Sequence, residues 1–297
     1  MIKQFDFQFE KQLAAKAGEL RIRALDMVYR AQSGHLGGAF SAAEILTVLY
    51  FYEMRLDHKA PRAEERDRFV LSKGHITPAY YAVLAMRGFF PMAELRGFRK
   101  FGSILQGHPD RKHIPGVDMS SGSLGQGVSA AVGMAIAGKL KGADFRVYTL
   151  LGDGEIQEGQ VWEAFMLAAH RKLNNLCAFI DNNDLQCDGH IGDVNSPYPI
   201  DAKLRAFGWN AVCIDGHDIH QLLTALDAAR NCVDRPTAII AKTVKGKGVS
   251  FMENQAGWHG KAPNADEYRT AMRELLSNPD IHPAVREEFE EAIRCAK

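Results

Sequence analysis

Cysteine, long hydrophobic runs and an excess of either charge are scarce or missing in this sequence. Its 297 residues include five cysteines, an odd number with no CxxC spacing, so the sequence indicates neither a disulfide framework nor a cysteine-ligated zinc site. We expect buried, reduced thiols in a cytoplasmic protein. No apolar run is long enough to span a membrane, and the N-terminal MIKQFDFQFE lacks the hydrophobic core of a signal peptide.

The charges balance, with 36 basic and 36 acidic residues, so there is no electrostatic reason to expect nucleic acid or a membrane surface as a partner. The composition, 46% hydrophobic and 24% charged, is that of a chain that can bury a sizeable core. No internal repeat, low-complexity tract or inter-domain linker interrupts it. We therefore expect a single domain over residues 1–297.

Short apolar runs alternate with segments of helical periodicity, a pattern that predicts an α/β fold with a parallel sheet sandwiched by helices. Ser41 followed by Glu44 is typical of a capping box and predicts a helix starting there. Glycine-rich loops are expected at 33–38, 88–127 and 245–263, the second with at most a short helix near 92–96. Strands are expected at 68–72, 145–151, 176–181, 209–214 and 237–241, and helices at 8–32, 41–54, 77–87, 124–141, 159–172, 200–206, 218–230, 264–276 and 283–295.

Polar residues follow two neighbouring strands of this sheet. Gly152-Asp153-Gly154 closes one apolar run, and Asn182-Asn183 closes the next. The carboxyl ends of parallel strands meet at one edge, where open α/β sheets bind ligands. A carboxylate and a carboxamide there suit Mg²⁺ or Ca²⁺ carrying a diphosphate. On its own, however, a Gly-Asp-Gly turn is equally typical of a plain connection from strand to helix.

Further motifs in the loops narrow the interpretation. LGDGEIQEG (151–159) is accompanied by SGH (33–35), SKGH (72–75), GHP (107–109), GSLGQG (122–127) and WHG (258–260). Together with the two asparagines, this set resembles the thiamine-diphosphate-binding motif in the form that transketolases carry. The resemblance extends over essentially the whole chain. It implies the fold of the domain that binds the diphosphate end of that cofactor.

The resemblance implies a role for individual residues. Asp153, Asn183 and the backbone carbonyl of Leu185 are expected to hold Mg²⁺, with Ca²⁺ as a possible substitute. The cofactor itself is expected to contact His75, Gly122, Ser123, Leu124, Gly154, Asn183 and His259.

The expected catalytic residues are His35, His108 and His259, which would line the channel to the reacting carbon, and Glu158, which would lie at a dimer interface linking two active sites. Without the resemblance, a loop histidine is more often solvated or structural, and that interpretation is kept for His113, His217 and His220. Glu158 has a simpler alternative as a solvated carboxylate at a helix start.

Two motifs depart from the family pattern. Ser123 stands where transketolases commonly carry proline, which leaves a backbone contact to the cofactor in place but makes the turn less rigid. The sequence SGHLGG (33–38) differs from the SGHPGAP of full-length transketolases, so His35 is retained in a loop that can run differently.

A full-length transketolase also carries a domain that binds the pyrimidine ring and supplies the glutamate that activates the cofactor. No such domain is recognisable here, and half a site cannot catalyse. We therefore expect the N-terminal subunit of a split transketolase, active on sugar phosphates with a separate C-terminal subunit in an α2β2 assembly. Three alternatives stay open: a transketolase for an unusual ketose, the α subunit of a thiamine-dependent 2-oxo acid dehydrogenase, and a non-catalytic module that binds a cation or diphosphate and regulates a partner.

Overall fold

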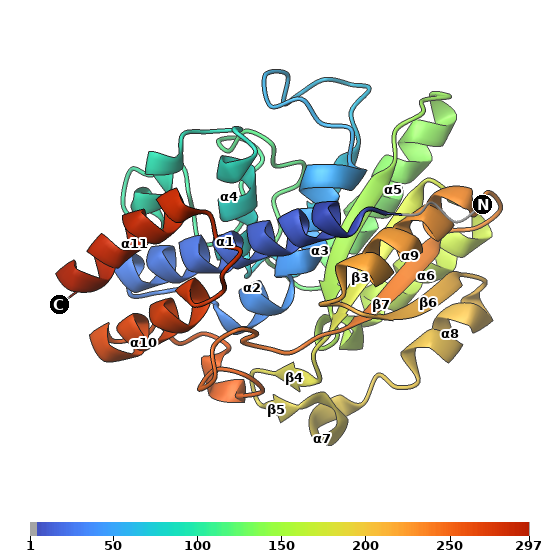
Figure 1. Ribbon diagram of the computed structural model, residues 1–297. Coiled ribbons are helices and arrows are strands. Elements are labelled where there is room, and N and C mark those ends of the chain that lie inside the picture. Colours follow the sequence, from blue (N-terminus) through green and yellow to red (C-terminus); the bar gives the residue numbers. More distant parts are fainter. Residues whose placement is uncertain (1–4, 297) are drawn as a thin grey trace.

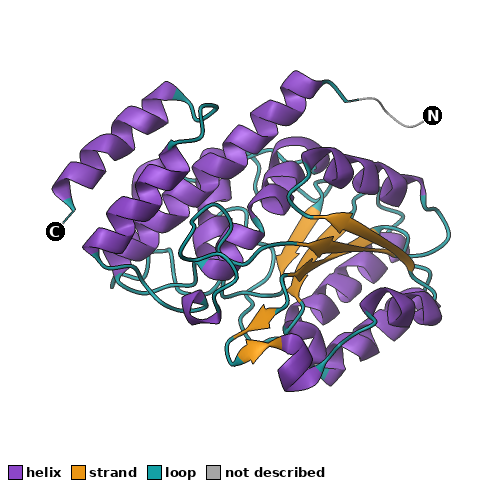
Figure 2. Ribbon diagram, turned by 60° about the horizontal axis from the view of Figure 1, so that its bottom comes forward, coloured by secondary structure: helices purple, strands orange, loops and turns teal. Residues whose placement is uncertain are grey.

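The computed structural model describes residues 5–296, which form helices on both faces of a parallel sheet, as predicted (Figures 1 and 2). The sheet has five strands in the order β1-β2-β3-β7-β6, every neighbouring pair parallel. Each strand lies within a residue or two of its predicted position. They are β1 (Arg68–Leu71), β2 (Val147–Gly152), β3 (Leu176–Asn182), β6 (Asn210–Asp215) and β7 (Thr237–Lys242).

Alternate residues of each strand enter two separate cores, because side chains along a strand point to opposite faces. Tyr148 and Leu150 of β2 pack with helices α1, α3, α4, α9, α10 and α11. Val147 and Leu151 pack on the other face with α5, α6 and α8. The helices are α1 (Phe7–Ala31), α2 (Gly37–Ser41), α3 (Ala43–Val48), α4 (Thr77–Met86), α5 (Gln126–Leu140), α6 (Gly159–His170), α7 (Ile191–Asn195), α8 (Ile200–Phe207), α9 (Ile219–Asn231), α10 (Ala265–Leu276) and α11 (Pro283–Cys295).

The predicted capping box at Ser41 is wrong. Ser41 is the last residue of α2, and the helical path continues through α3 into a π-helical turn over Leu49–Glu53. The Ser41 hydroxyl donates to the Asp181 carboxylate (2.5 Å), and the Gly38 carbonyl lies 3.0 Å from the same oxygen. Glu44 binds Arg21 of α1. Ser41 and Glu44 thus bind residues distant in sequence, although their local spacing predicts that they cap a helix.

The long segment before α5 contains a 3-10 helix at Met92–Gly97, as predicted. Sequence reasoning missed the small antiparallel hairpin of β4 (Leu185–Gln186) and β5 (Gly189–His190), and also α7 behind it. These elements are too short to have a recognisable period. They matter because β4 begins two residues after Asn183, and both of its residues line a cavity described below.

The cysteine prediction holds in part. Cys177, Cys187, Cys213 and Cys232 are all free, but Cys187 and Cys213 are exposed rather than buried. The side chain of Cys295 lies outside what the structure describes. Over residues 5–296, none of the helices has both the length and the apolar character needed to cross a membrane.

Trp209 offers a direct test of the packing on the α6 side of the sheet. It is buried, its ring lies edge-on to Phe165 with centroids 5.0 Å apart, and its Nε1–H donates to the Phe165 carbonyl (2.8 Å). We expect Trp209→Ala to lower the free energy of unfolding by about 3–5 kcal/mol, through lost burial and a cavity.

The matched control is Phe101→Ala, since Phe101 is fully exposed at 110%. Its effect should stay within about 0.5 kcal/mol. Urea denaturation measures both variants. A Trp209→Ala protein as stable as the unaltered chain would contradict the described core.

Candidate active site

Strand register brings the predicted residues together at the carboxyl edge of the sheet. Gly152 of β2 pairs with Asp181 of β3, and Asn182 pairs with Lys242 of β7. The residues that follow these pairs, Asp153 and Asn183, are therefore neighbours, as the sequence predicts. Both are buried.

The Asp153 carboxylate is already oriented by hydrogen bonds. It accepts from the backbone amides of Gly154 (2.8 Å) and Asp184 (2.6 Å) and from the Asn182 side chain (3.2 Å). Burial and the nearby Asp181 carboxylate raise the pKa of Asp153 to about 6, against the effect of these hydrogen bonds. A buried carboxylate with a raised pKa is a group whose charged form a bound cation would stabilise.

Asp181, which was not predicted as a site residue, is the centre of the buried hydrogen-bond network. It is fully buried and binds Lys73, Ser41 and Thr243. Burial alone would raise its pKa, but the charge and hydrogen bond of Lys73 lower it. The Asn183 side chain also donates to Asp181 (3.2 Å), which leaves Asn183 Oδ1 as the acceptor, and that oxygen receives the Leu185 amide (3.2 Å).

A cavity of about 290 Å³ opens beside this network. Several of the predicted residues line it together with two lysines, Lys73 and Lys245, that sequence reasoning missed. Lys73 lies inside the SKGH motif, whereas nothing local marks Lys245. The predicted residues lining the cavity are His75, Leu124, Asp153, Gly154, Glu158, Asn183, Leu185 and His259.

Lys245 lies between two predicted site residues. Its buried ammonium is 3.0 Å from the Leu185 carbonyl and 2.9 Å from His259 Nδ1. Burial, reinforced by the charge of Lys73, lowers the pKa of Lys245 to about 8. Because an ammonium only donates, His259 Nδ1 accepts and Nε2 carries the proton of this imidazole.

Three of the four predicted histidines form one cluster. His75 stacks on His259 with centroids 5.1 Å apart, and His35 lies edge-on to both at 5.2 and 5.5 Å. Burial, with nearby positive charges, lowers the pKa of His35 to about 4, that of His259 to about 3, and that of His75 well below its usual value. These imidazoles are neutral near pH 7 and act there as hydrogen-bonding groups. His35 Nδ1 is buried and has no partner among the described residues.

The fourth histidine, His108, is exposed and does not line the cavity. Its ring packs on Gly122, where an added Cβ would lie 2.7 Å from His108 Cδ2. Gly122 has φ +148, so both its conformation and this contact favour glycine. Ser123 is exposed beside it, and of this loop only Leu124 reaches the cavity wall.

The two glutamates at the start of α6 differ. Glu158 is exposed at the cavity mouth. Glu155, also missed, is buried and accepts from Ser72 (2.6 Å) and from the amides of Gly125 (3.0 Å) and Gly152 (3.1 Å). Its carboxylate therefore links the carboxyl ends of β1 and β2 to the loop before α5, and these segments form part of the cavity wall.

The donor set fits a hard cation carrying an anionic group. Among residues 5–296 no cluster of three or more His, Cys, Asp or Glu suits a metal, but Asp153, Asn183 and Leu185 line one cavity at the sheet edge and offer a carboxylate, a carboxamide and a carbonyl. Lys73, Lys245 and His75 face the same cavity and can pair with anionic oxygens. Gly38 also lines the cavity, and an added Cβ there would lie 3.1 Å from Ile76 Cγ2, so the site has little room for a side chain at this position.

Comparison with known proteins agrees with this chemistry. Residues 11–296 match the family model described as "Transketolase, thiamine diphosphate binding domain". The chain is 42% identical over 263 residues to the 6-deoxy-6-sulfo-D-fructose transketolase subunit SqwG of Clostridium sp. strain MSTE9, covering 89% of this chain and 96% of that one. It is 41% identical over 255 residues to one of the subunits of the apulose-4-phosphate transketolase of Phocaeicola vulgatus, covering 86% and 90%.

A solved structure, the transketolase of Campylobacter jejuni, superimposes with a TM-score of 0.87 at 32% identity. The match covers 98% of this chain but 47% of that one. The chain therefore spans less than half the length of that enzyme, and nearly the full length of the two subunits.

The buried ion pair can be tested apart from any ligand. Asp181→Asn leaves the Lys73 ammonium buried without its counter-charge, so we expect a loss of about 3–5 kcal/mol in the free energy of unfolding. The double variant Lys73→Met/Asp181→Asn removes both charges of this pair, so the Lys73 ammonium is no longer buried without Asp181, and we expect part of that stability to return.

Urea unfolding at pH 7 measures both variants, with Asp234→Asn on the exposed Arg235–Asp234 pair as the control. The control should leave the stability nearly unchanged, because solvent screens an exposed pair. If Asp181→Asn has the same free energy of unfolding as the control, the Lys73–Asp181 pair does not stabilise this edge of the sheet, which would contradict the expectation.

Proposed function

The chain belongs to the transketolase family, and from that premise we propose that it is the diphosphate-binding subunit of a two-chain transketolase. One observation carries the proposal. The buried Asp153–Asn183 edge opens on a cavity whose walls hold Lys73, Lys245 and neutral imidazoles. This arrangement suits a divalent cation and a diphosphate, and the family's cofactor supplies the diphosphate, to which such a cation would bind as a separate ion.

Asp153, Asn183 and the Leu185 carbonyl would hold Mg²⁺, and Ca²⁺ could replace it, because both cations take oxygen ligands. The Asp153 oxygens are already oriented by hydrogen bonds, which favours a preformed metal site. The diphosphate oxygens would face His75, Lys245 and Gly154, all of which line the cavity. His259, whose Nδ1 accepts from Lys245, would present Nε2–H to the cofactor or substrate.

The remaining predicted residues would act around the reacting carbon. His35 keeps a buried Nδ1, unpartnered within residues 5–296, available for a hydrogen bond, and it lies against His75 and His259. His108 would reach a substrate from the rim, and Gly122, Ser123 and Leu124 would border the aminopyrimidine. Glu158, exposed at the cavity mouth, is placed where it can meet a second polypeptide.

The proposed reaction transfers a two-carbon ketol unit from a ketose to an aldose. When bound, thiamine diphosphate supplies the electron sink for breaking and forming the carbon–carbon bond. This chain would bind and orient it and donate hydrogen bonds to substrate oxygens through neutral histidines. A separate C-terminal subunit would carry the pyrimidine site, in an α2β2 assembly, and the described chain would act as one diphosphate-binding domain.

The substrates we propose are ketoses and aldoses with an anionic terminal group. Sugar phosphates are the first candidates. The names of the two subunit relatives mention a sulfonated ketose and apulose 4-phosphate, which supports including unusual ketoses in that class. These relatives favour a transketolase over the 2-oxo acid dehydrogenase and over a non-catalytic module. The cytoplasmic location stays a prediction.

Asp153 should be essential for cofactor binding. We expect Asp153→Asn to weaken binding of Mg²⁺–thiamine diphosphate on the order of 100-fold, since an anionic oxygen ligand to a hard cation is lost. Isothermal titration calorimetry measures the affinity. Asp144→Asn, at an exposed carboxylate before β2, is the matched control and should bind normally. Equal affinity of the Asp153→Asn and Asp144→Asn proteins would remove Asp153 from the site.

Catalysis should require two polypeptides. We expect no ketol transfer from xylulose 5-phosphate to ribose 5-phosphate by this chain alone. Activity should appear on mixing it with its C-terminal partner, and Asp153→Asn in the mixture should abolish it. Full turnover by the isolated chain would overturn the half-site proposal, whereas Mg²⁺–thiamine diphosphate binding without turnover in any mixture would favour the regulatory module.

A further inference from the structure

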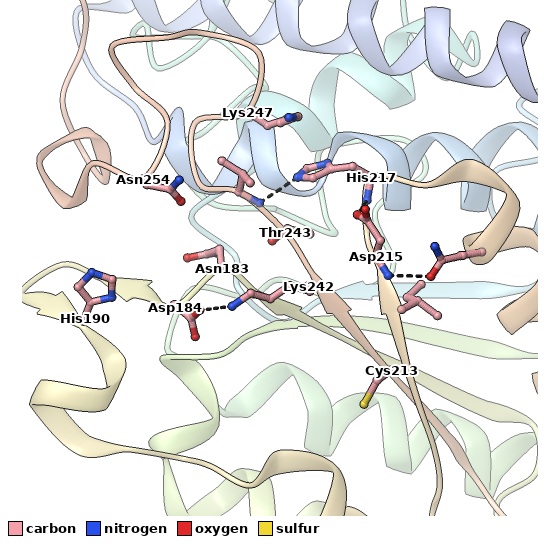
Figure 3. Close-up of a pocket in the computed structure, with 13 residues that line it drawn as sticks. Asn183, Asp184, His190, Cys213, Asp215, His217, Lys242, Thr243, Lys247 and Asn254 are labelled. Carbon is pink, nitrogen blue, oxygen red and sulfur yellow. Dashed lines mark hydrogen bonds and ion pairs between the residues drawn. The ribbon is translucent and has the colours of Figure 1, made fainter.

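The segment that leaves β7 separates the candidate active site from a second cavity. Lys242, Thr243 and Val244 line this second cavity of about 720 Å³, shown in Figure 3. The next residue, Lys245, lines the candidate active site. The position of Lys245 therefore depends on how the preceding residues are held.

Each of these residues has a partner on another element. Lys242 pairs with Asp184, as Figure 3 shows, and Thr243 donates to Asp181. The backbone N–H of Val244 donates to His217 Nε2 (2.9 Å), a bond drawn as a dashed line in Figure 3. Just beyond the end of β7, the His217 side chain thus accepts a backbone hydrogen bond of the kind that a neighbouring strand accepts within the sheet.

His217 is itself fixed from the other side. Its Nδ1 is 2.9 Å from Glu44 Oε2, and Glu44 forms two bonds of 2.7 Å to the guanidinium of Arg21. Because Nε2 accepts from Val244, Nδ1 carries the proton and donates to Glu44. The chain of contacts runs from α1 through α3 to the turn before α9 and ends at the loop that carries Lys245.

The turn that carries His217 also binds the segment directly. The Gly216 amide donates to the Lys242 carbonyl (2.7 Å), and a Cβ at Gly216 would lie 2.5 Å from Thr243 Cγ2. The His217 amide donates to Asp215 (2.8 Å). The turn and the segment are therefore in close contact, and His217 has little freedom to adopt another position.

We propose that His217 is a positioning residue for the cofactor site, which it serves by holding the Val244 amide and so fixing Lys245 between Leu185 and His259. The proposal rests on the function proposed above. It revises the expectation that His217 is solvated or only structural, since its side chain is 14% exposed and its Nε2 acts on the loop of the site. Without this bond the Val244 amide loses its side-chain acceptor, and the backbone that leads to Lys245 loses one of the contacts that fix it.

Two substitutions of His217 test its bond to Val244 and its bond to Glu44 independently. His217→Gln keeps a polar group near the position of Nε2 and can still accept from Val244, whereas His217→Asn keeps one near Nδ1 and can still contact Glu44. We expect His217→Asn and His217→Ala to weaken Mg²⁺–thiamine diphosphate binding on the order of tenfold, the usual effect of losing an outer positioning contact. His217→Gln should restore most of the affinity.

The matched control is His220→Ala, because His220 lies on α9 and its ring nitrogen contacts Glu10 of α1 rather than the segment 242–245. Calorimetry gives the affinities, and hydrogen exchange of the Val244 amide reports the bond to His217 without any ligand. Exchange should be faster in His217→Asn and His217→Ala than in His217→Gln or His220→Ala.

A double-mutant cycle tests the route through Lys245. In a Lys245→Met background, His217→Ala should change the affinity less than about twofold, since the two changes remove the same contact. An unchanged Val244 exchange rate, or an equal loss of affinity in both backgrounds, overturns the proposal. If the unaltered chain binds no Mg²⁺–thiamine diphosphate, alone or with its partner, the proposed function fails instead, and Val244 exchange still decides whether His217 holds the segment.

Discussion

The buried ion pair between Lys73 and Asp181 is the constraint on which the site depends. Asp153, Glu155 and Asp181 place three buried carboxylates close to one edge of the sheet, which would be costly without compensation. Lys73 supplies the counter-charge, and hydrogen bonds from Ser41, Thr243 and backbone amides satisfy the remaining oxygens. Asp153 has a raised pKa and, within the described part of the chain, no ion pair of its own, so its charge is available for a cation.

The register of the sheet brings these polar residues together around one cavity. Register between β2, β3 and β7 aligns Gly152 with Asp181 and Asn182 with Lys242, and the residues just beyond these pairs converge on one cavity. The loops after β1 and β7 bring His75 and His259 onto the same side, where burial keeps both imidazoles neutral. Through His217, even α1 and α3 reach the loop that carries Lys245, so helices remote from the cavity take part in its geometry.

Much of this arrangement could be predicted from the sequence, because apolar runs mark the buried strands and polar residues mark their ends. Asp153 and Asn183 were singled out in this way, whereas His75 and His259 came from the family resemblance, which also gave the roles expected of all four. The capping box failed because Ser41 and Glu44 have tertiary partners that no local pattern reveals. Lys245 was missed and the bonds of His217 were not foreseen for the same reason: both side chains contact segments distant in sequence. The motif around His108 likewise did not indicate that its side chain is exposed and packs on Gly122.

The central claim is that Asp153, Asn183 and the Leu185 carbonyl anchor the cation and diphosphate of thiamine diphosphate. Anomalous scattering from crystals grown with Mn²⁺ and thiamine diphosphate tests it most directly. We predict one strong manganese peak in contact with these three groups, and the diphosphate beside His75 and Lys245. A manganese ion elsewhere, or a diphosphate bound away from this edge of the sheet, would contradict the account.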